Sequence, residues 1–239
     1  MRFFLVHGVP SSGALWSGVR RFVPGESVAP DLPGFGGSAD VFVGGGNRSG
    51  IFEAHVAWLE RRVEVGDHLV GHDYGGLLAA VVASRKRVAS LTLISTGLGP
   101  GWWPAKLAAL PVAERICYRT FGGRRWLSRG VATEVGREFV VTHEQWLETR
   151  MSIRMRDVAR GMPWSGDEVR RRLVAGCVPI RCVWARDDRA FPPWMGRRLA
   201  HSLGASFSTA PGGHYGVVDY PEAWAAALMP SAEIPALSN

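Results

Sequence analysis

The segment that offers the most chemistry is Gly71–Gly75, in which Asp73 follows an apolar run and precedes a helical one. A sharp turn from a strand into a helix brings its own backbone close together, so it needs small residues two places before and two places after the apex. Gly71 and Gly75 occupy those places. The apex residue lies above the amino end of the helix, where the macrodipole favours an ionised carboxylate. We therefore predict that Asp73 is a nucleophile, because a carboxylate needs no base to attack an electrophilic carbon.

A histidine and an acid can complete the chemistry of such a nucleophile. His214 lies in a glycine-rich loop after the last apolar run, where an imidazole has no packing role, and we predict that it is the general base. The acid that orients the base is expected between nucleophile and histidine in chain order, at the end of a strand. Asp187 and Asp188 both follow the apolar run Ile180–Trp184. The residues by themselves therefore leave two candidates for the acid.

The elements that must position these residues alternate along the chain. Short apolar and β-branched runs alternate with longer helical patterns, which predicts an α/β fold with a mostly parallel sheet and flanking helices. Open sheets of this kind carry their chemistry at the carboxyl ends of the strands. The predicted strands are Phe3–Val6, Ser27–Ala29, His68–Val70, Leu91–Ile94, Ile180–Trp184 and Ser206–Thr209.

The strand pattern is absent between Gly97 and Cys177. Within this stretch, Ala105–Thr120 and Thr133–Met151 have apolar positions three or four residues apart, as amphipathic helices do. We expect residues 1–97 and 178–239 to form the α/β core, and residues 98–177 to form a helical cap. The loops that carry the candidate site open at the carboxyl edge of the sheet, so the cap is expected to cover that edge.

Composition and charge exclude several classes of protein. The chain has 239 residues, of which 46% are hydrophobic and 21% are charged, so it is neither a disordered segment nor a disulfide miniprotein. The formal net charge is +7, but no basic run is longer than Arg170–Arg172, and we expect no nucleic-acid partner. The 3 cysteines include no C-x-x-C pair, which predicts neither a disulfide framework nor a zinc site.

The expected location and partners follow from the same features. The first apolar run, Phe3–Val6, is too short for a signal peptide or a membrane span, so we expect a cytoplasmic protein with no membrane partner. An aspartate nucleophile with a histidine base needs neither a metal ion nor an organic cofactor, and we expect neither. The remaining partner is a small-molecule substrate.

Several motifs occur in an order that resembles the α/β-hydrolase superfamily over essentially the whole chain: His7–Pro10, Asp31–Gly36, Gly71–Gly75 and Pro211–His214. The resemblance implies that the backbone N–H groups of Val9 and Tyr74 form an oxyanion hole. In family members the acid lies three residues after a small residue that closes the strand, and Ala185 takes that place here, which selects Asp188. The strands that precede the first one in larger members are expected to be missing.

Most members of this superfamily carry serine at the turn, and the aspartate here resembles the epoxide hydrolases and, more distantly, the haloalkane dehalogenases. The resemblance implies that Asp73 forms an alkyl ester, which a water activated by His214 then hydrolyses at the carbonyl carbon of Asp73. Dehalogenases bind the halide with a tryptophan after the nucleophile and with an asparagine or a second tryptophan. Tyr74 and Val9 stand at two of these positions, which disfavours dehalogenation.

An epoxide hydrolase must also donate a hydrogen bond or a proton to the epoxide oxygen. The family usually uses two tyrosines of the cap, whereas the predicted cap has Tyr118 alone, which is equally well explained as packing of its own helix. Trp102, Trp103, His143 and Tyr215 are candidates for a second donor. Because the predicted cap is rich in aromatic residues, we expect a bulky, aromatic or polyketide-like epoxide.

Other functions stay open at this stage. A lyase, isomerase or cyclase could use Asp73 and His214 only as acid and base. An esterase or lactonase is less favoured, because attack of Asp73 on an ester would give an anhydride. A haloalkane dehalogenase is also less favoured, and a ligand sensor without catalysis is least favoured, since it does not require Asp73, Asp188 and His214 together.

Overall fold

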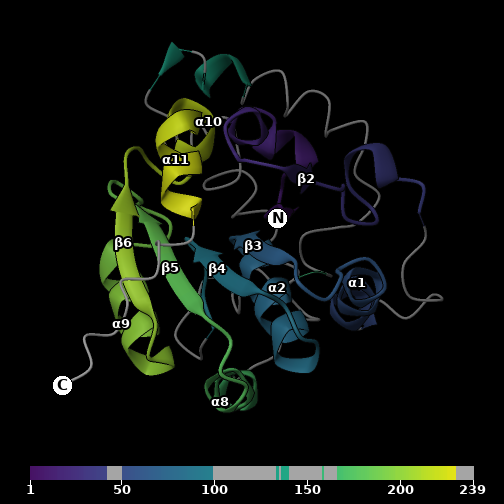
Figure 1. Ribbon diagram of the computed structural model, residues 1–239. Helices are drawn as coiled ribbons and strands as arrows, with labels where there is room; N and C mark the ends of the chain where they lie inside the picture. Colours follow the sequence, from purple (N-terminus) through teal and green to yellow (C-terminus); the bar gives the residue numbers. More distant parts are fainter. Residues whose placement is uncertain (42–49, 99–132, 135, 140–157, 159–165, 230–239) are drawn as a thin grey trace, which may run out of the picture.

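The computed structural model describes residues 1–41, 50–98, 133–134, 136–139, 158 and 166–229 (Figure 1). The predicted helix Ala105–Thr120 and most of Thr133–Met151 lie outside the described residues. So do Trp102, Trp103, Tyr118 and His143, whose predicted roles therefore stay predictions. Within the described ranges, no helix is both long enough and apolar enough to cross a membrane.

A parallel sheet of 6 strands, in the order β2-β1-β3-β4-β5-β6, forms the centre of the molecule. The predicted parallel α/β architecture is confirmed, and each predicted strand is present with bounds shifted by a residue or two. Val6 pairs with Gly71, His72 with Ile94, and Ala185 with Ala210, so the carboxyl ends of these strands lie side by side. The strands are β1 (Arg2–Val6), β2 (Glu26–Val28), β3 (His68–His72), β4 (Ser90–Ile94), β5 (Ile180–Ala185) and β6 (Ser206–Ala210).

Helices cover both faces of the sheet, because alternate strand residues point to opposite sides. Phe4 and Val6 pack under α1 (Ile51–Glu60), α2 (Tyr74–Arg85), α8 (Asp167–Ala175) and α9 (Pro193–Leu203). Phe3 and Leu5 pack on the other side under η1 (Gly13–Trp16), η2 (Val19–Arg21), α10 (Gly216–Asp219) and α11 (Pro221–Leu228). The short η3 (Gly36–Ser38) precedes α1. The result is an apolar core on each face.

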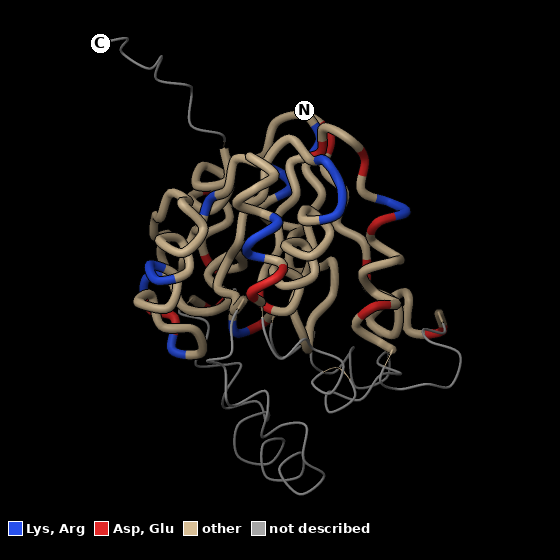
Figure 2. The backbone as a smooth tube through the Cα atoms, turned by 90° about the horizontal axis from the view of Figure 1, so that it is seen from below, with Lys and Arg blue, Asp and Glu red and all other residues tan. Residues whose placement is uncertain are grey.

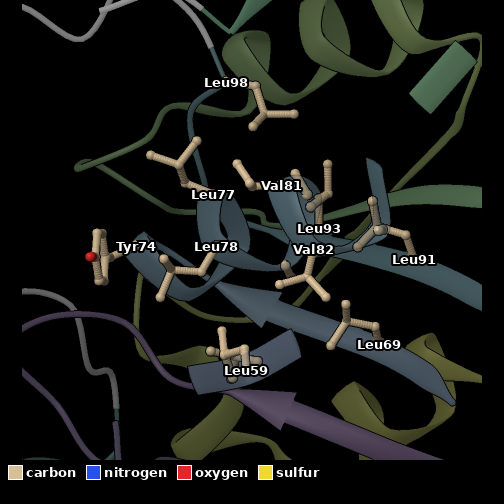
Figure 3. Close-up of a cluster of buried hydrophobic side chains, with 14 of the residues drawn as sticks. Leu59, Leu69, Tyr74, Leu77, Leu78, Val81, Val82, Leu91, Leu93 and Leu98 are labelled. Carbon is tan, nitrogen blue, oxygen red and sulfur yellow. The ribbon is translucent and has the colours of Figure 1, made fainter. Parts of the chain in front are cut away.

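The helix α2 is central to the first of these cores. Its Leu78 and Val82 lie against the sheet beside Leu69 of β3 and Leu93 of β4 (Figure 3). All of these side chains are fully buried. Because α2 begins directly after Asp73, this packing fixes the position of the candidate nucleophile relative to the sheet.

The helix α8 lies within residues 98–177 but differs from the prediction for that segment. It packs against α2 and α9, and its Leu173 is buried in the same core, so it belongs to the helix layer on one face of the sheet. Its arginines pair with acids of the same helix, as Arg171 and Arg172 do with Glu168 at 2.8 Å. Basic and acidic residues are likewise mixed along the described backbone (Figure 2).

A described part of the predicted cap, residues 133–139 with position 135 excepted, is attached beside α10 (teal in Figure 1). Oδ1 of Asp219 accepts hydrogen bonds from the N–H and the hydroxyl of Thr133, at 3.1 and 2.6 Å. The Thr133 hydroxyl in turn accepts the N–H of Gly136 at 3.0 Å, as an N-cap residue does. Phe139 packs against the core on the α10 face. This segment is therefore tied to the helix that follows His214.

Candidate active site

Asp73 occupies a sharp turn between β3 and α2. Its backbone angles are φ 51° and ψ −121°. Residues other than glycine rarely adopt this conformation, which costs about 1–3 kcal/mol. A Cβ at Gly71 would lie 2.3 Å from the carbonyl oxygen of Gly75, and a Cβ at Gly75 would lie 2.4 Å from that of His7. Only glycine fits at these two positions, which is the steric reason for the spacing seen in the sequence.

The end of β4 holds this strained backbone in place. The N–H of Asp73 donates to the carbonyl oxygen of Ile94 at 3.0 Å. The hydroxyl of Thr96 donates to the carbonyl oxygen of Asp73 at 2.6 Å. A Cβ at Gly76 would come within 2.6 Å of the Thr96 side chain. The turn is thus fixed by hydrogen bonds on both sides of Asp73.

The turn after β1 lies directly against the Asp73 side chain. The N–H of Val9 donates to Oδ2 of Asp73 at 3.0 Å. A Cβ at Gly8 would lie 2.6 Å from Cβ of Asp73 and 2.7 Å from its Oδ2, so the close approach requires glycine. A backbone donor of the predicted oxyanion hole therefore contacts the carboxylate itself.

His7 and Asp31 shape this turn. The Nδ1–H of His7 donates to the carbonyl oxygen of Gly8 at 2.7 Å, and its Nε2 accepts the N–H of Leu32 at 2.9 Å. The two carboxylate oxygens of Asp31 accept the N–H groups of Gly13 and Gly37, each at 2.6 Å. The loops after β1 and β2 are therefore connected by the side chain of His7 from the first and that of Asp31 from the second.

The buried position of Asp73 disfavours its charge. Burial raises the pKa of Asp73 above its ordinary value, while the nearby His214 and the backbone N–H groups of Val9 and Tyr74 hold this rise back. The groups that stabilise the carboxylate are therefore the predicted base and the two predicted oxyanion-hole residues.

His214 and Asp188 form a buried pair at the ends of β6 and β5. Nδ1 of His214 donates to Oδ2 of Asp188 at 2.9 Å. The other oxygen of Asp188 accepts the N–H groups of Ala190 and Phe191 at 2.8 and 2.9 Å. The side chain of Asp187 is exposed instead. Of the two candidate acids, Asp188 is thus the one that contacts the histidine.

The pair stabilises its own charges. Burial is the largest single influence and opposes ionisation of both side chains, but the mutual attraction and the hydrogen bonds together outweigh it, so that the pKa of His214 is raised and the pKa of Asp188 is lowered. The nearby Asp73 adds to the rise of the His214 pKa. With Nδ1 bonded to Asp188, the imidazole is oriented to exchange a proton at Nε2.

Aromatic rings enclose the histidine. Phe191 stacks on the ring of His214 with centroids 5.5 Å apart, and Tyr215 meets it edge-on at 5.2 Å. Tyr215 is buried and its side chain packs in the core on the α10 face. Its predicted role as a donor to substrate stays a prediction.

Some residues around the site were not predicted from the sequence. Thr96 holds the backbone of Asp73, and Asp31 ties two loops together. Both stand in the small or polar clusters that end strands, and this position is the signal that could have identified them. Among the described residues, no group of three or more His, Cys, Asp or Glu side chains is arranged to hold a metal ion.

Comparison with solved structures places this geometry among known folds. The chain is similar to a thermophilic esterase from Thermogutta terrifontis (24% identity, 95% of this chain and 88% of that chain covered, TM-score 0.75). It is also similar to a loop variant of a haloalkane dehalogenase from Bradyrhizobium elkanii (20% identity, 95% of this chain and 89% of that chain covered, TM-score 0.71). A bromoperoxidase from Bacillus anthracis is similar as well (15% identity, 95% of this chain and 90% of that chain covered, TM-score 0.72). At these identities the similarity establishes the fold alone.

Sequence comparison supplies the family. No curated protein matches the chain. The family model described as "Alpha/beta hydrolase family" matches residues 3–227, which includes the sheet except the first residue of β1 and each of the loops that carry Asp73, Asp188 and His214. Since the match spans nearly the whole chain and agrees with the fold, the chain belongs to the alpha/beta hydrolase family.

Proposed function

We propose that this hydrolase opens epoxides through a covalent ester on Asp73. The observation that carries the proposal is the 3.0 Å hydrogen bond from the Val9 N–H to Oδ2 of Asp73. When serine is the nucleophile, an oxyanion hole receives the carbonyl oxygen of the substrate. Here the donor contacts an oxygen of the enzyme's own carboxylate, where an oxyanion develops only if Asp73 itself becomes an ester and is attacked.

In the first step, Oδ1 of Asp73 attacks a carbon of the epoxide. A new bond forms between that oxygen and the carbon, the ring C–O bond breaks, and the released oxygen receives a proton from a tyrosine hydroxyl or a hydrogen bond from an indole N–H. Tyr118, Trp102, Trp103 and Tyr215 are the proposed donors. Oδ2 becomes the carbonyl oxygen of the ester and keeps its bond to Val9.

In the second step, Nε2 of His214 takes a proton from water, and the water oxygen attacks the carbonyl carbon of Asp73. The negative charge then develops on Oδ2, against the N–H of Val9, with the N–H of Tyr74 as the second proposed donor. Collapse breaks the ester bond, His214 returns the proton to the leaving oxygen, and a diol is released. The carboxyl group of Asp73 keeps the hydroxyl of the water and gives up its proton to the group left without one after the first step, which restores the resting carboxylate. Asp188 stabilises the imidazolium between these events.

The proposed substrate class is based on the aromatic side chains in the segment 98–177. Their number favours a bulky, aromatic or polyketide-like epoxide. No step of this mechanism uses a metal ion or a cofactor. A cytoplasmic location and the absence of nucleic-acid and membrane partners belong to the same proposal.

Mass spectrometry of the His214→Ala variant with an epoxide panel tests the mechanism. The variant should accumulate an adduct equal in mass to the protein plus the epoxide, located on Asp73. In a single turnover of the unaltered protein in oxygen-18 water, the label should enter the Asp73 carboxylate and not the first diol. If the label enters only the diol and no adduct accumulates, the covalent mechanism is wrong.

A second candidate is favoured by one observation, the raised pKa of Asp73. A carboxyl group that holds a proton more readily can serve as an acid. The second candidate is therefore a lyase, isomerase or cyclase that uses Asp73 and His214 only as acid and base. Absence of an adduct in the His214→Ala experiment would favour this candidate.

A further inference from the structure

His72 connects the two parts of the proposed site. It is the last residue of β3 and immediately precedes Asp73. Its ring lies 4.6 Å from the ring of His214, centroid to centroid. Its Nε2 lies 2.9 Å from the backbone carbonyl oxygen of His214, 142 positions along the chain. One side chain thus joins the strand that carries the nucleophile to the loop that carries the base.

The hydrogen bond defines the protonation of this histidine. A carbonyl oxygen only accepts hydrogen bonds, so Nε2 of His72 carries the hydrogen. Nδ1 is buried and has no hydrogen-bond partner within the described part of the chain. Burial, and then the adjacent His214, lower the pKa of His72 to about 3, so the ring is neutral at physiological pH.

Packing alone does not explain a histidine here. A buried nitrogen without a partner costs stability, and an apolar ring of similar size would fill the space without that cost. The surroundings are rings that an apolar residue would suit: Trp16 lies edge-on at 6.4 Å and Tyr215 lies at 6.0 Å. What histidine adds is the donor to the carbonyl oxygen of His214.

This bond completes the support of His214. Asp188 holds Nδ1 of its ring, and Phe191 stacks on the ring. Neither of these contacts fixes the backbone of His214, whereas His72 bonds to that backbone. His72 also stays neutral among the titratable groups that face it, which are His7, Asp188 and His214, so it adds no repulsion when His214 takes a proton.

We propose that His72 is a positioning residue for the hydrolysis step, which acts by holding the backbone and ring of His214 at a fixed place relative to Asp73. The proposal rests on the proposed function, since His214 must reach a water beside the ester of Asp73. Formation of the ester involves no proton transfer to His214, so a loss of His72 slows the second step far more than the first.

Two substitutions of His72 test this role, because one keeps an aromatic ring and the other keeps the N–H donor. His72→Phe keeps a ring and loses the donor, whereas His72→Gln keeps an N–H near the position of Nε2. In single turnovers followed by mass spectrometry, His72→Phe should form the ester at a rate within about twofold of the unaltered protein and hydrolyse it about 10- to 100-fold more slowly. His72→Gln should recover much of that loss. His68→Phe is the matched control on the same strand, because His68 bonds to Ser90 at 2.8 Å and has no contact with His214.

A titration distinguishes this role from a structural one. A displaced His214 loses part of its bond to Asp188, so its pKa, measured by nitrogen-15 NMR, should fall in His72→Phe and stay near the original in His72→Gln and His68→Phe. This measurement needs no substrate, so it tests His72 even if no epoxide forms an adduct and the proposed function fails. An unaltered His214 pKa in folded His72→Phe, or equal losses of hydrolysis in the Phe and Gln variants, would overturn the proposal. If His72→Phe does not fold, His72→Asn replaces it, because the shorter side-chain amide of asparagine does not reach the carbonyl oxygen of His214. Equal His214 pKa values in the Asn and Gln variants would then overturn the proposal.

Discussion

The hydroxyl of Tyr74 donates a hydrogen bond to Nδ1 of His55 across 3.0 Å. The direction is set by the other nitrogen of His55, whose hydrogen bonds to the carbonyl oxygen of Pro33 at 2.9 Å. Tyr74 follows the candidate nucleophile, yet its hydroxyl hydrogen is committed to α1 and its side chain packs in the core (Figure 3). Only the backbone of Tyr74 is therefore expected to serve the reaction.

Tyr74→Phe tests this separation of side chain and backbone. The change removes the donor to His55 and leaves a buried nitrogen without its partner, so the free energy of unfolding should fall by about 1–2 kcal/mol in urea. The rate of ester formation at Asp73 should stay within about twofold, because the Tyr74 N–H is unchanged. A large loss of alkylation in a folded Tyr74→Phe protein would show that the hydroxyl serves the substrate.

His55 should make the fold sensitive to acid. Burial lowers its pKa from 6.5 to about 4 in the folded protein. Between these values the unfolded chain binds a proton that the folded chain does not, so stability is present above pH 6.5 and is lost as the pH falls toward 4. The loss attributable to His55 is about 3 kcal/mol over this interval. Urea unfolding at several pH values should show a shallower dependence in His55→Asn, although this variant is less stable throughout. His201→Gln, at an exposed position of α9, is the control and should leave the profile unchanged.

Asp188 and Asp187 should differ sharply when substituted. Asp188→Asn removes the charge that stabilises the imidazolium of His214, so hydrolysis of the ester should slow by about a thousandfold or more. Asp187→Asn, next to it but exposed, should change hydrolysis by less than about twofold. Rapid-quench measurements of the ester in both variants make the comparison, and equal losses would refute the assignment of Asp188.

Asp73→Asn should increase the stability of the folded protein and abolish its activity. Because the folded-state pKa of Asp73 is raised, its charge costs stability at every pH above its ordinary value, and the neutral amide removes that cost. We expect the variant to unfold at a higher urea concentration at neutral pH and to form no ester. The same raised pKa predicts that ester formation by the unaltered protein declines, as the pH falls, at a higher pH than an ordinary aspartate would give. A less stable Asp73→Asn protein would contradict the first expectation.

Local patterns predicted the parts of the molecule that local sterics decide. The strands follow from short apolar runs, and the turn at Asp73 follows from Gly71 and Gly75, whose missing side chains the backbone contacts require. Contacts between distant segments were not predictable in the same way. The bond from His72 to the backbone of His214, and that from Tyr74 to His55, depend on how segments distant in the sequence meet. The prediction of a cap over residues 98–177 likewise did not reveal that α8 packs against α2 and α9.

The attachment of Thr133 to Asp219 has a consequence for protein engineering. Asp219 ends the short helix that begins just after His214, and it accepts two hydrogen bonds from Thr133, the residue that caps a helical segment of the insert. A chimera that receives the insert of a relative keeps this anchor only if serine or threonine stands opposite Asp219. Replacement of residues 99–132 alone, with the junction placed before Thr133, would exchange Trp102, Trp103 and Tyr118 and leave the anchor of the histidine loop in place.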